Sequence, residues 1–254
     1  MFQIAISPAS GKRLIAKAVA RHPGILSKMQ SGKIVIIAGS TNGYVVEEIL
    51  KTLENPCEFD RKGFFRGLTM PPSRSKERNS QPNKAEFPGD ILIEDGHIIK
   101  SKTIFDIADQ LNDGDIIIKG VNAFDIKNRK AAVLVGHPKG GTVAAAIQAV
   151  KDRNAKLILP VGLEKRISDD LEKLSAKFDS PTKGGLRLIV APGEIISEIE
   201  AVNILSGANA ELFAGGGVCG AEGSVWLAVS GTSEQEKSAK AIIDSVQDEP
   251  QFNL

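Results

Sequence analysis

The chain lacks the residues that organise disulfide-stabilised or metal-centred proteins. It has only two cysteines, Cys57 and Cys219, which lie far apart in the sequence. A disulfide framework and a cysteine zinc site are therefore excluded as organising features. The three histidines, His22, His97 and His137, do not have the spacing of metal ligands. We expect no metal site.

Long apolar runs and an excess of one charge are also missing. No run approaches the roughly 18 apolar residues of a membrane span, and residues 1–7 lack the basic and apolar regions of a signal peptide. The formal net charge is +1, which gives no reason to expect nucleic acid or an anionic membrane as a partner. We predict a cytoplasmic protein that binds neither membranes nor nucleic acid.

Runs of β-branched residues alternate with helical patterns along most of the chain. This alternation is typical of βα units in a mostly parallel sheet, and 254 residues with 42% hydrophobic content are enough for one large domain or two small ones. We predict a single Rossmann-like α/β domain over residues 1–254, with a mostly parallel, doubly wound sheet in a three-layer sandwich.

The expected strands are 2–6, 33–38, 90–94, 97–100, 115–118, 131–135, 156–160, 186–190, 209–214 and 224–230. The expected central strands are 33–38, 115–118, 131–135 and 156–160. The expected helices are 11–21, 43–54, 103–111, 141–152, 167–177, 194–205 and 233–246.

One short segment predicts a β-hairpin within this pattern. In the segment Ile91–Ile99, Asp95-Gly96 lies between two apolar runs, 91–93 and 98–99. An Asp-Gly pair between two such runs is typical of a two-residue hairpin turn.

A long polar loop over residues 59–88 interrupts the alternation. It has no apolar periodicity, and we expect its residues 68–86 to be poorly ordered without a ligand. The loop is either a solvated surface segment or a lid. As a lid, it would close Arg66, Arg74 and Lys76 over an anionic ligand.

Glycine-rich loops that follow expected strands are the most informative pattern. The first, Gly39-Ser40-Thr41-Asn42-Gly43, follows strand 33–38. A strand that ends in glycine and continues into a helix directs free N–H groups and a positive dipole at one point, which suits a phosphate or carboxylate. Ser40, Thr41 and Asn42 are also good N-cap residues. The loop therefore either binds an anion or only caps a helix that begins near Gly43.

The second loop, Lys119-Gly120-Val121-Asn122-Ala123-Phe124-Asp125, follows strand 115–118. Packing does not easily explain Lys119 at the carboxyl end of a buried strand. Asn122 could orient a hydroxyl or carbonyl group, and Asp125 could act as a general base. The alternative is a turn in which Asn122 is left-handed and Asp125 caps the following residues.

The third loop, His137-Pro138-Lys139-Gly140-Gly141-Thr142, follows strand 131–135. Gly140 and Gly141 would give a ligand access to the backbone, Lys139 would meet its charge, and Thr142 would lie at the start of a helix. The loop is not a P-loop, because Thr142 stands at the lysine position. An ATPase is therefore not favoured.

A fourth segment, Gly215-x-Gly217-x-x-Gly220, has the letters of the dinucleotide fingerprint. The strand 224–230 follows it instead of a helix, which argues against a classical NAD site. Glu222 in this segment is either a nucleophile or base or a turn glutamate in a β-hairpin.

Three of these segments resemble the NagB/RpiA/CoA transferase-like superfamily, which contains ribose-5-phosphate isomerase A, glucosamine-6-phosphate deaminase and CoA transferases. Residues 37–43 are similar to its phosphate loop, 115–125 to its strand ending in a Gly-Ala-Asp-type turn, and 139–142 to its lysine-glycine loop. The Glu222 loop is similar to the glutamate loop of CoA transferases. Asn122 and Ala123 replace acidic residues of the isomerase turn, so the base for isomerisation would have to come from elsewhere.

The resemblance implies a doubly wound fold and an enzyme that acts on a phosphorylated sugar or a CoA-linked metabolite, as an isomerase or transferase. The alternative is a non-catalytic ligand-binding or regulatory protein of the same fold, which the loss of the acids at Asn122 and Ala123 favours. Nucleic-acid binding through residues 61–84 is disfavoured by the near-neutral net charge.

We expect a small anionic ligand, CoA or a phosphorylated compound, and a homo-oligomer. The candidate catalytic residues are Lys119, Asp125 and Glu222, and the candidate ligand-binding residues are Gly39, Ser40, Thr41, Asn42, Gly43, Asn122, Lys139, Gly140, Gly141 and Thr142.

If the preceding strands are parallel, the loops 39–43, 119–122 and 139–142 meet at one edge of the sheet and form an anion site. On this hypothesis Lys139→Ala weakens a phosphate ligand by about 1.5–3 kcal/mol, the range for a charged hydrogen bond.

Overall fold

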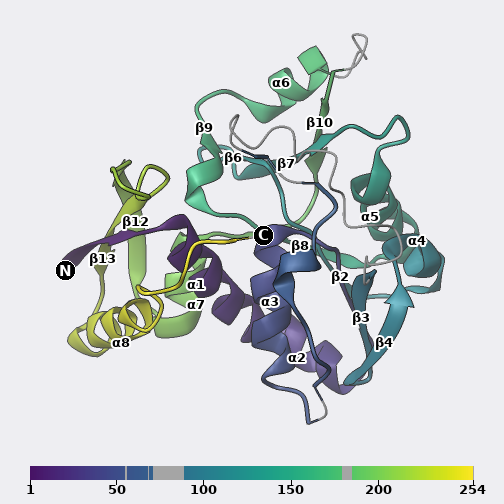
Figure 1. The fold of residues 1–254 in the computed structure, drawn as a ribbon, viewed down its shortest axis with the longest axis horizontal. Helices are drawn as coiled ribbons and strands as arrows, with labels where there is room; N and C mark the ends of the chain where they lie inside the picture. Colours follow the sequence, from purple (N-terminus) through teal and green to yellow (C-terminus); the bar gives the residue numbers. More distant parts are fainter. Residues whose placement is uncertain (55, 68, 71–88, 179–184, 254) are drawn as a thin grey trace.

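The structure is a computed structural model that describes residues 1–54, 56–67, 69–70, 89–178 and 185–253. Within these ranges the chain is a mixed α/β protein with eight α-helices and thirteen strands in three sheets. In Figure 1 the three-stranded sheet lies at the left, the four-stranded sheet at the top and the six-stranded sheet at the lower right.

The six-stranded sheet is partly parallel. In spatial order its strands are β11 (Glu194–Ile196), β8 (Lys156–Pro160), β5 (Ile116–Ile118), β2 (Lys33–Ile36), β3 (Asp90–Glu94) and β4 (His97–Lys102). The first four are parallel, whereas β3 and β4 are antiparallel to their neighbours. Apart from the half-buried Lys33, the strands β2 and β5 consist of buried Ile and Val, as is typical of strands covered on both faces. The carboxyl ends of the four parallel strands therefore lie along one edge.

The β3–β4 hairpin confirms the prediction made from Asp95-Gly96. Both turn residues have positive φ, 49° at Asp95 and 78° at Gly96, as a type I′ turn requires. The Asp95 carboxylate accepts a hydrogen bond from the Gly32 N–H at 2.7 Å. This bond ties the turn to the start of β2.

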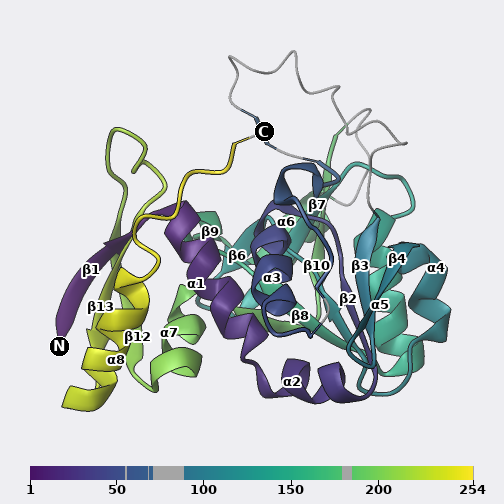
Figure 2. The same cartoon turned by 60° about the horizontal axis from the view of Figure 1, so that its bottom comes forward.

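The helices are α1 (Pro8–Ala20), α2 (Pro23–Gln30), α3 (Ser40–Leu50), α4 (Ile104–Ile107), α5 (Gly141–Arg153), α6 (Leu171–Phe178), α7 (Glu198–Ser206) and α8 (Ser233–Asp244). Figure 2 shows α1, α2 and α3 close together; α1 packs against α3 and α7, and α2 contacts β2 and β5. α5 contacts β8 of the six-stranded sheet and β10 of the four-stranded sheet. α2 is absent from the expected helices, and α3 begins at Ser40 and not near Gly43.

The four-stranded sheet corrects the predicted topology. Its order is β10 (Arg187–Ala191), β7 (Lys130–Val135), β6 (Ala123–Asp125) and β9 (Arg166–Ile167). The prediction that 33–38 and 131–135 lie in one sheet is wrong, because β7 pairs antiparallel with β6 and β10. Only residues 126–129 join β6 to β7, and a parallel connection needs a dozen residues or more.

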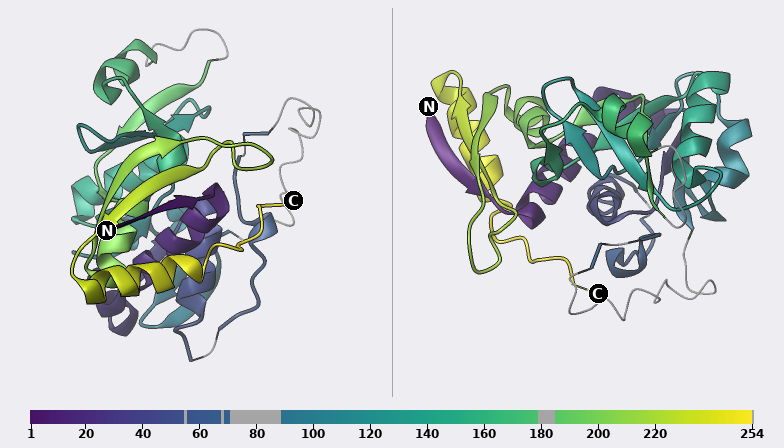
Figure 3. Two further views of the ribbon diagram at one scale, coloured as in Figure 1. Left: turned by 90° about the vertical axis from the view of Figure 1, so that its left-hand side faces the viewer. Right: turned by 90° about the horizontal axis from the view of Figure 1, so that it is seen from above.

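The three-stranded sheet is antiparallel, with the order β1 (Phe2–Ile6), β13 (Val225–Ser230) and β12 (Asn209–Gly215). α7 packs against β12 and α8 against β13, as the left view of Figure 3 shows. After α8 the chain runs back along α1. The Ser10 hydroxyl donates to the Gln247 carbonyl at 3.2 Å, and Gln247 Nε2 donates to the Ala5 carbonyl at 3.0 Å.

Part of the long polar loop lies outside the described residues. The segment 68–86, expected to be poorly ordered without ligand, is described only at residues 69–70. Among the helices that the structure describes, none combines the length and apolar character that a membrane crossing requires.

Candidate functional site

The candidate site is the row of loops at the carboxyl edge of the six-stranded sheet. The loops after β2, β5, β8 and β11 are neighbours there because these strands are adjacent and parallel. The antiparallel β3 starts at the same edge, where the Asp90 carboxylate accepts a hydrogen bond from the Ala38 N–H at 2.9 Å. Lys119 follows β5, Lys165 follows β8 and Glu198 follows β11.

The loop after β2 leads directly into α3, whose first turn has no side-chain cap. The N-cap residue is Gly39, which offers the first turn no side-chain hydrogen bond. Asn42 Nδ2 donates to the carbonyls of Ile37 (2.7 Å) and Ile118 (3.1 Å). This bridge holds the first loop against the end of β5, where the second loop begins. Among the described residues the buried Oδ1 of Asn42 has no hydrogen-bond partner, and it lies 3.9 Å from where a Cβ on Gly120 of the second loop would stand.

Lys119 begins the loop after β5 among charged side chains from three other segments. Its Nζ donates a hydrogen bond to the Gly120 carbonyl at 3.1 Å. Burial lowers the pKa of the Lys119 amine to about 8, an effect that the Asp90 carboxylate opposes and the positive charges of Arg66 and Lys165 reinforce. Near pH 8, Lys119 therefore has a large neutral fraction.

Two further lysines reach this edge, one from the loop after β8 and one from α1. Lys165 Nζ lies 3.5 Å from Thr41 Oγ1, in the first turn of α3. Lys12 is on α1, and its pKa is lowered by burial and by the charge of Lys165, whereas Glu164 and Glu198 raise it. Lys12, Lys119 and Lys165 thus form a cluster of three amines, called here the lysine cluster.

Glu198 is a buried carboxyl group beside the lysine cluster. It is the first residue of α7, it is 1% exposed, and its Oε2 accepts a hydrogen bond from the Leu163 N–H at 2.9 Å. A Cβ on Gly11 of α1 would lie 2.3 Å from Oε1, so this glycine gives the carboxyl group its space. Burial and the like charge of Glu164 raise the pKa of Glu198 to about 8, although backbone hydrogen bonds and Lys165 oppose the rise. At neutral pH Glu198 holds its proton.

Asp90 and Arg66 form an ion pair at the β3 end of this row. Arg66 Nη2 donates to Asp90 Oδ1 at 2.8 Å, and Oδ2 accepts a hydrogen bond from the Ile104 N–H at 2.8 Å. Of the three basic residues of the hypothetical lid, Arg66 therefore lies at this edge. Arg74 and Lys76 lie outside the described residues.

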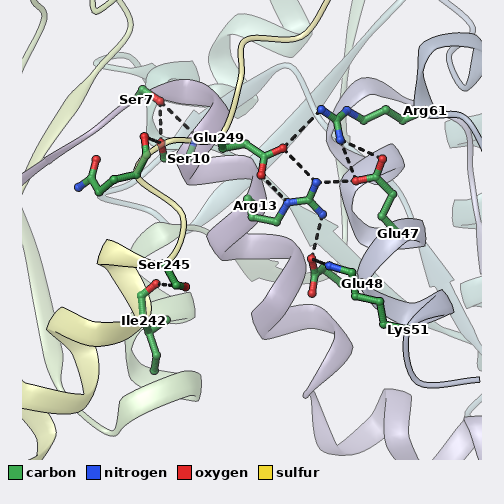
Figure 4. A network of polar contacts seen from close by, with 11 residues as sticks. Ser7, Ser10, Arg13, Glu47, Glu48, Lys51, Arg61, Ile242, Ser245 and Glu249 are labelled. Atoms are coloured by element: carbon green, nitrogen blue, oxygen red, sulfur yellow. Dashed lines mark hydrogen bonds and ion pairs between the residues drawn. The ribbon is translucent and has the colours of Figure 1, made fainter.

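Arg13, next to Lys12 in the chain, holds α1 beside α3 (Figure 4). Its Nη1 donates to Glu48 at 2.9 Å and its Nη2 to Glu47 at 2.5 Å, both on α3. Nε and Nη2 donate to the two carboxylate oxygens of Glu249 at 2.8 and 3.0 Å. The guanidinium thus joins α1, α3 and the C-terminal segment, and it fixes the helix that carries Lys12.

A second arginine and an aromatic ring complete this network. Arg61 Nη1 donates to both carboxylate oxygens of Glu47, at 2.9 and 2.8 Å. The guanidinium groups of Arg13 and Arg61 lie 4.8 and 4.4 Å from the centre of the Tyr44 ring. Such cation–π contacts add to the attraction between the charges.

The third glycine loop belongs to the four-stranded sheet. Residues 136–139 are exposed, and Arg187 of β10 donates to the carbonyls of His137 (3.0 Å) and Pro138 (2.7 Å). We expected this loop at the shared edge because strand 131–135 was predicted to lie in the same parallel sheet as 33–38. That prediction is wrong. A ligand-binding role for Lys139, Gly140, Gly141 and Thr142 stays a prediction.

Asp125, a candidate base, holds the β6–β7 turn. Its carboxylate accepts hydrogen bonds from the Asn128 N–H at 2.9 Å and from Asn128 Nδ2 at 2.7 Å. Burial raises the pKa of Asp125, but these hydrogen bonds outweigh it and hold the pKa below its usual range. A carboxylate with this pKa suits a turn cap better than a base matched to neutral pH.

Glu222 and Asn122 also serve in local structure. Glu222 is exposed in the β12–β13 loop and accepts a hydrogen bond from the Gly220 N–H at 2.9 Å. Asn122 Oδ1 accepts a hydrogen bond from the Leu134 N–H of β7 at 3.0 Å. For Glu222 the turn alternative describes the observed contact. Asn122 does not have the left-handed φ that its turn alternative required, and its side chain bonds to the neighbouring strand β7 instead.

We expect Asp125→Ala to destabilise the fold by about 1–3 kcal/mol, because it removes the buried carboxylate that accepts two hydrogen bonds from Asn128 and holds the β6–β7 turn. Glu222→Ala is the matched control: its side chain is exposed, and its loss should change stability by less than about 0.5 kcal/mol. Urea unfolding of the two variants measures both effects. Equal stabilities would contradict the turn role of Asp125.

Sequence reasoning missed Lys12, Glu164, Lys165 and Glu198. The loop after β8, which carries Glu164 and Lys165, could have been found from the sequence. Strand 156–160 was expected, and if it is parallel to 115–118 the carboxyl ends of both strands lie at the same edge of the sheet. Ser197-x-x-Glu200 is a capping-box pattern, which marks the start of α7 and so the place of Glu198. Lys12 had no such signal.

Within the described ranges, no group of three or more His, Cys, Asp or Glu side chains is placed to hold a metal ion. Comparison with known proteins does not assign the chain to a family: no family model matches it, and no curated protein matches it. The function must therefore be argued from the site.

Proposed function

We propose that the carboxyl edge of the six-stranded sheet binds a small anionic metabolite, a phosphorylated sugar or a CoA-linked compound. On this proposal the protein is an isomerase-like or transferase-like enzyme of the NagB/RpiA/CoA transferase-like superfamily, and the four parallel strands are the core of a doubly wound, three-layer fold. The observation that carries the proposal is the lysine cluster beside the first turn of α3.

The electrostatics of the cluster favour an anion. The charge of Lys165 lowers the pKa of both Lys12 and Lys119, so the positive charges oppose one another in partly buried surroundings. Glu198, with its raised pKa, offsets little of this charge at neutral pH, whereas Glu164 offsets part of it at Lys12 and Asp90 part of it at Lys119. A phosphate or carboxylate would relieve the repulsion, and the N–H groups at the start of α3 would supply directional hydrogen bonds.

A non-catalytic ligand-binding or regulatory protein is the second candidate. It is favoured by the roles of Asp125 and Glu222, which hold turns, and by the burial of Glu198. The two candidates share the ligand site and differ in whether the ligand is changed after it binds.

A thermal-shift screen against sugar phosphates, CoA esters and nucleotides tests the site, because a ligand raises stability by RT ln(1 + [L]/Kd). We expect Lys165→Ala to weaken the best ligand by about 1.5–3 kcal/mol, or roughly 10- to 150-fold in Kd. The loss of one charged donor at the start of α3 is the physical reason.

Lys156→Ala is the matched control, because Lys156 is exposed at the opposite end of the same strand, β8. It removes the same charge and should leave Kd unchanged. Lys139→Ala tests the third loop separately: a loss of affinity in this variant, with none in Lys165→Ala, would move the site to the four-stranded sheet.

A further inference from the structure

We propose that Lys119 is a nucleophile that forms an imine with an aldehyde or ketone group of the anionic ligand. This inference rests on the proposed function, because the lysine cluster is what would bring the ligand to the amine. It narrows the substrate class to anionic carbonyl compounds.

The placement of Lys119 supports this role. It stands at the carboxyl end of the buried strand β5, between the loop after β2, which starts α3, and the loop after β8, which carries Lys165. The residue is partly buried and keeps some solvent exposure, and its Nζ donates to the Gly120 carbonyl, its own neighbour in the chain. A ligand anion held by Lys165 and the first turn of α3 would thus lie in the loop row that contains the amine.

The charges around Lys119 favour its neutral form. Arg66 and Lys165 act from two sides and Asp90 opposes them; with burial, the pKa is about 8. A lysine amine attacks carbonyl carbon only when it is unprotonated, and desolvation and neighbouring cations are the known ways of activating it. An ordinary lysine, with a pKa near 10.4, is less than about 1% neutral at pH 8.

The chemistry balances without a further reactant. The nitrogen lone pair forms a bond to the carbonyl carbon, the carbonyl π electrons move to oxygen, and one proton passes from nitrogen to that oxygen to give a carbinolamine. The nitrogen then releases its second proton, its electron pair forms the carbon–nitrogen double bond of the imine, and the oxygen leaves with both protons as water. Hydrolysis by one water reverses the sequence and returns the free amine.

The test uses pyridoxal 5′-phosphate, an aldehyde that carries a phosphate, as the probe. The full chain is incubated with a low concentration of the probe and reduced with borohydride, which converts an imine into a stable secondary amine, and the modified lysines are located by peptide mass spectrometry. We expect Lys119 to be labelled at least tenfold faster at pH 8 than the exposed Lys156. The rate should level off above pH 8, and inorganic phosphate should slow it.

Lys119→Arg keeps the positive charge and should abolish the fast labelling. The wild-type pH profile does not depend on how that variant folds, so it is a second, independent measurement. Labelling spread evenly over exposed lysines, or a Lys119 rate that rises up to pH 10, overturns the imine proposal. If thermal shifts with phosphate ligands persist in that case, the imine alone fails; if neither is seen, the proposed ligand site fails as well.

Discussion

Arg13→Met is expected to destabilise the folded protein by about 3–5 kcal/mol, the range for breaking a buried ion pair by removing one partner. The Arg13 side chain is 10% exposed and donates to three carboxylates, those of Glu47, Glu48 and Glu249. Methionine keeps the apolar stem but leaves these carboxylates together without the charge between them. Urea unfolding at pH 7 measures the loss.

Two further variants separate charge from geometry. Arg13→Lys keeps the charge but loses the planar fork that contacts Glu249 through two nitrogens, so it should fall between wild type and Arg13→Met. Arg153→Met removes an exposed arginine at the end of α5 and should change stability by less than about 0.5 kcal/mol. If Arg13→Met lay within 1 kcal/mol of Arg153→Met, the network would be no more than a surface ion pair.

The regular elements could be predicted where a single physical signal dominates. The runs at 33–36 and 116–118 consist mainly of Ile and Val and are buried in β2 and β5, and Asp95-Gly96 has the chemistry of its turn. β11 was missed, because its three residues, Glu194–Ile196, fall at the start of an expected helix. Three residues are too few to show the periodic pattern of apolar residues that predicts a strand.

The wrong sheet partner for 131–135 has a similar cause. β6, Ala123–Asp125, is also three residues long; it follows one turn-forming residue, Asn122, and ends on another, Asp125. The sequence could therefore be interpreted as a turn, and the hairpin that reverses the chain before β7 was not expected. Because this short strand was missed, the third glycine loop was expected at the edge of the wrong sheet.

About half of the candidate site could be predicted from the sequence, because it follows strands that have a clear signal. Lys119 and the Gly39–Asn42 loop follow strands that were expected to be parallel strands of one sheet, and the structure pairs these two strands in parallel. Lys12 could not be predicted, because its place at the edge depends on how α1 packs against α3 and α7, a tertiary contact without a local signal. The ion pairs of Arg13, with partners at 47, 48 and 249, are the non-local interactions that hold α1 beside α3.

Glu198→Gln is expected to stabilise the protein increasingly as the pH rises from about 5 to 8. The pKa of Glu198 is about 8 in the folded state and about 4.3 in the unfolded chain, so between these values the folded state holds a proton that the unfolded state has lost. Wild-type stability therefore falls with rising pH in this window, by up to roughly 1.4 kcal/mol for each pH unit from this group. Glutamine does not titrate, and the variant should be close to wild type at pH 5 and more stable by several kcal/mol at pH 8.

Urea unfolding at pH 5, 6, 7 and 8 measures the difference, with Glu211→Gln, exposed on β12, as the control. A difference between Glu198→Gln and wild type that did not change with pH would mean that Glu198 is ionised in the fold, and the lysine cluster would then have a permanent buried counter-charge in place of a ligand.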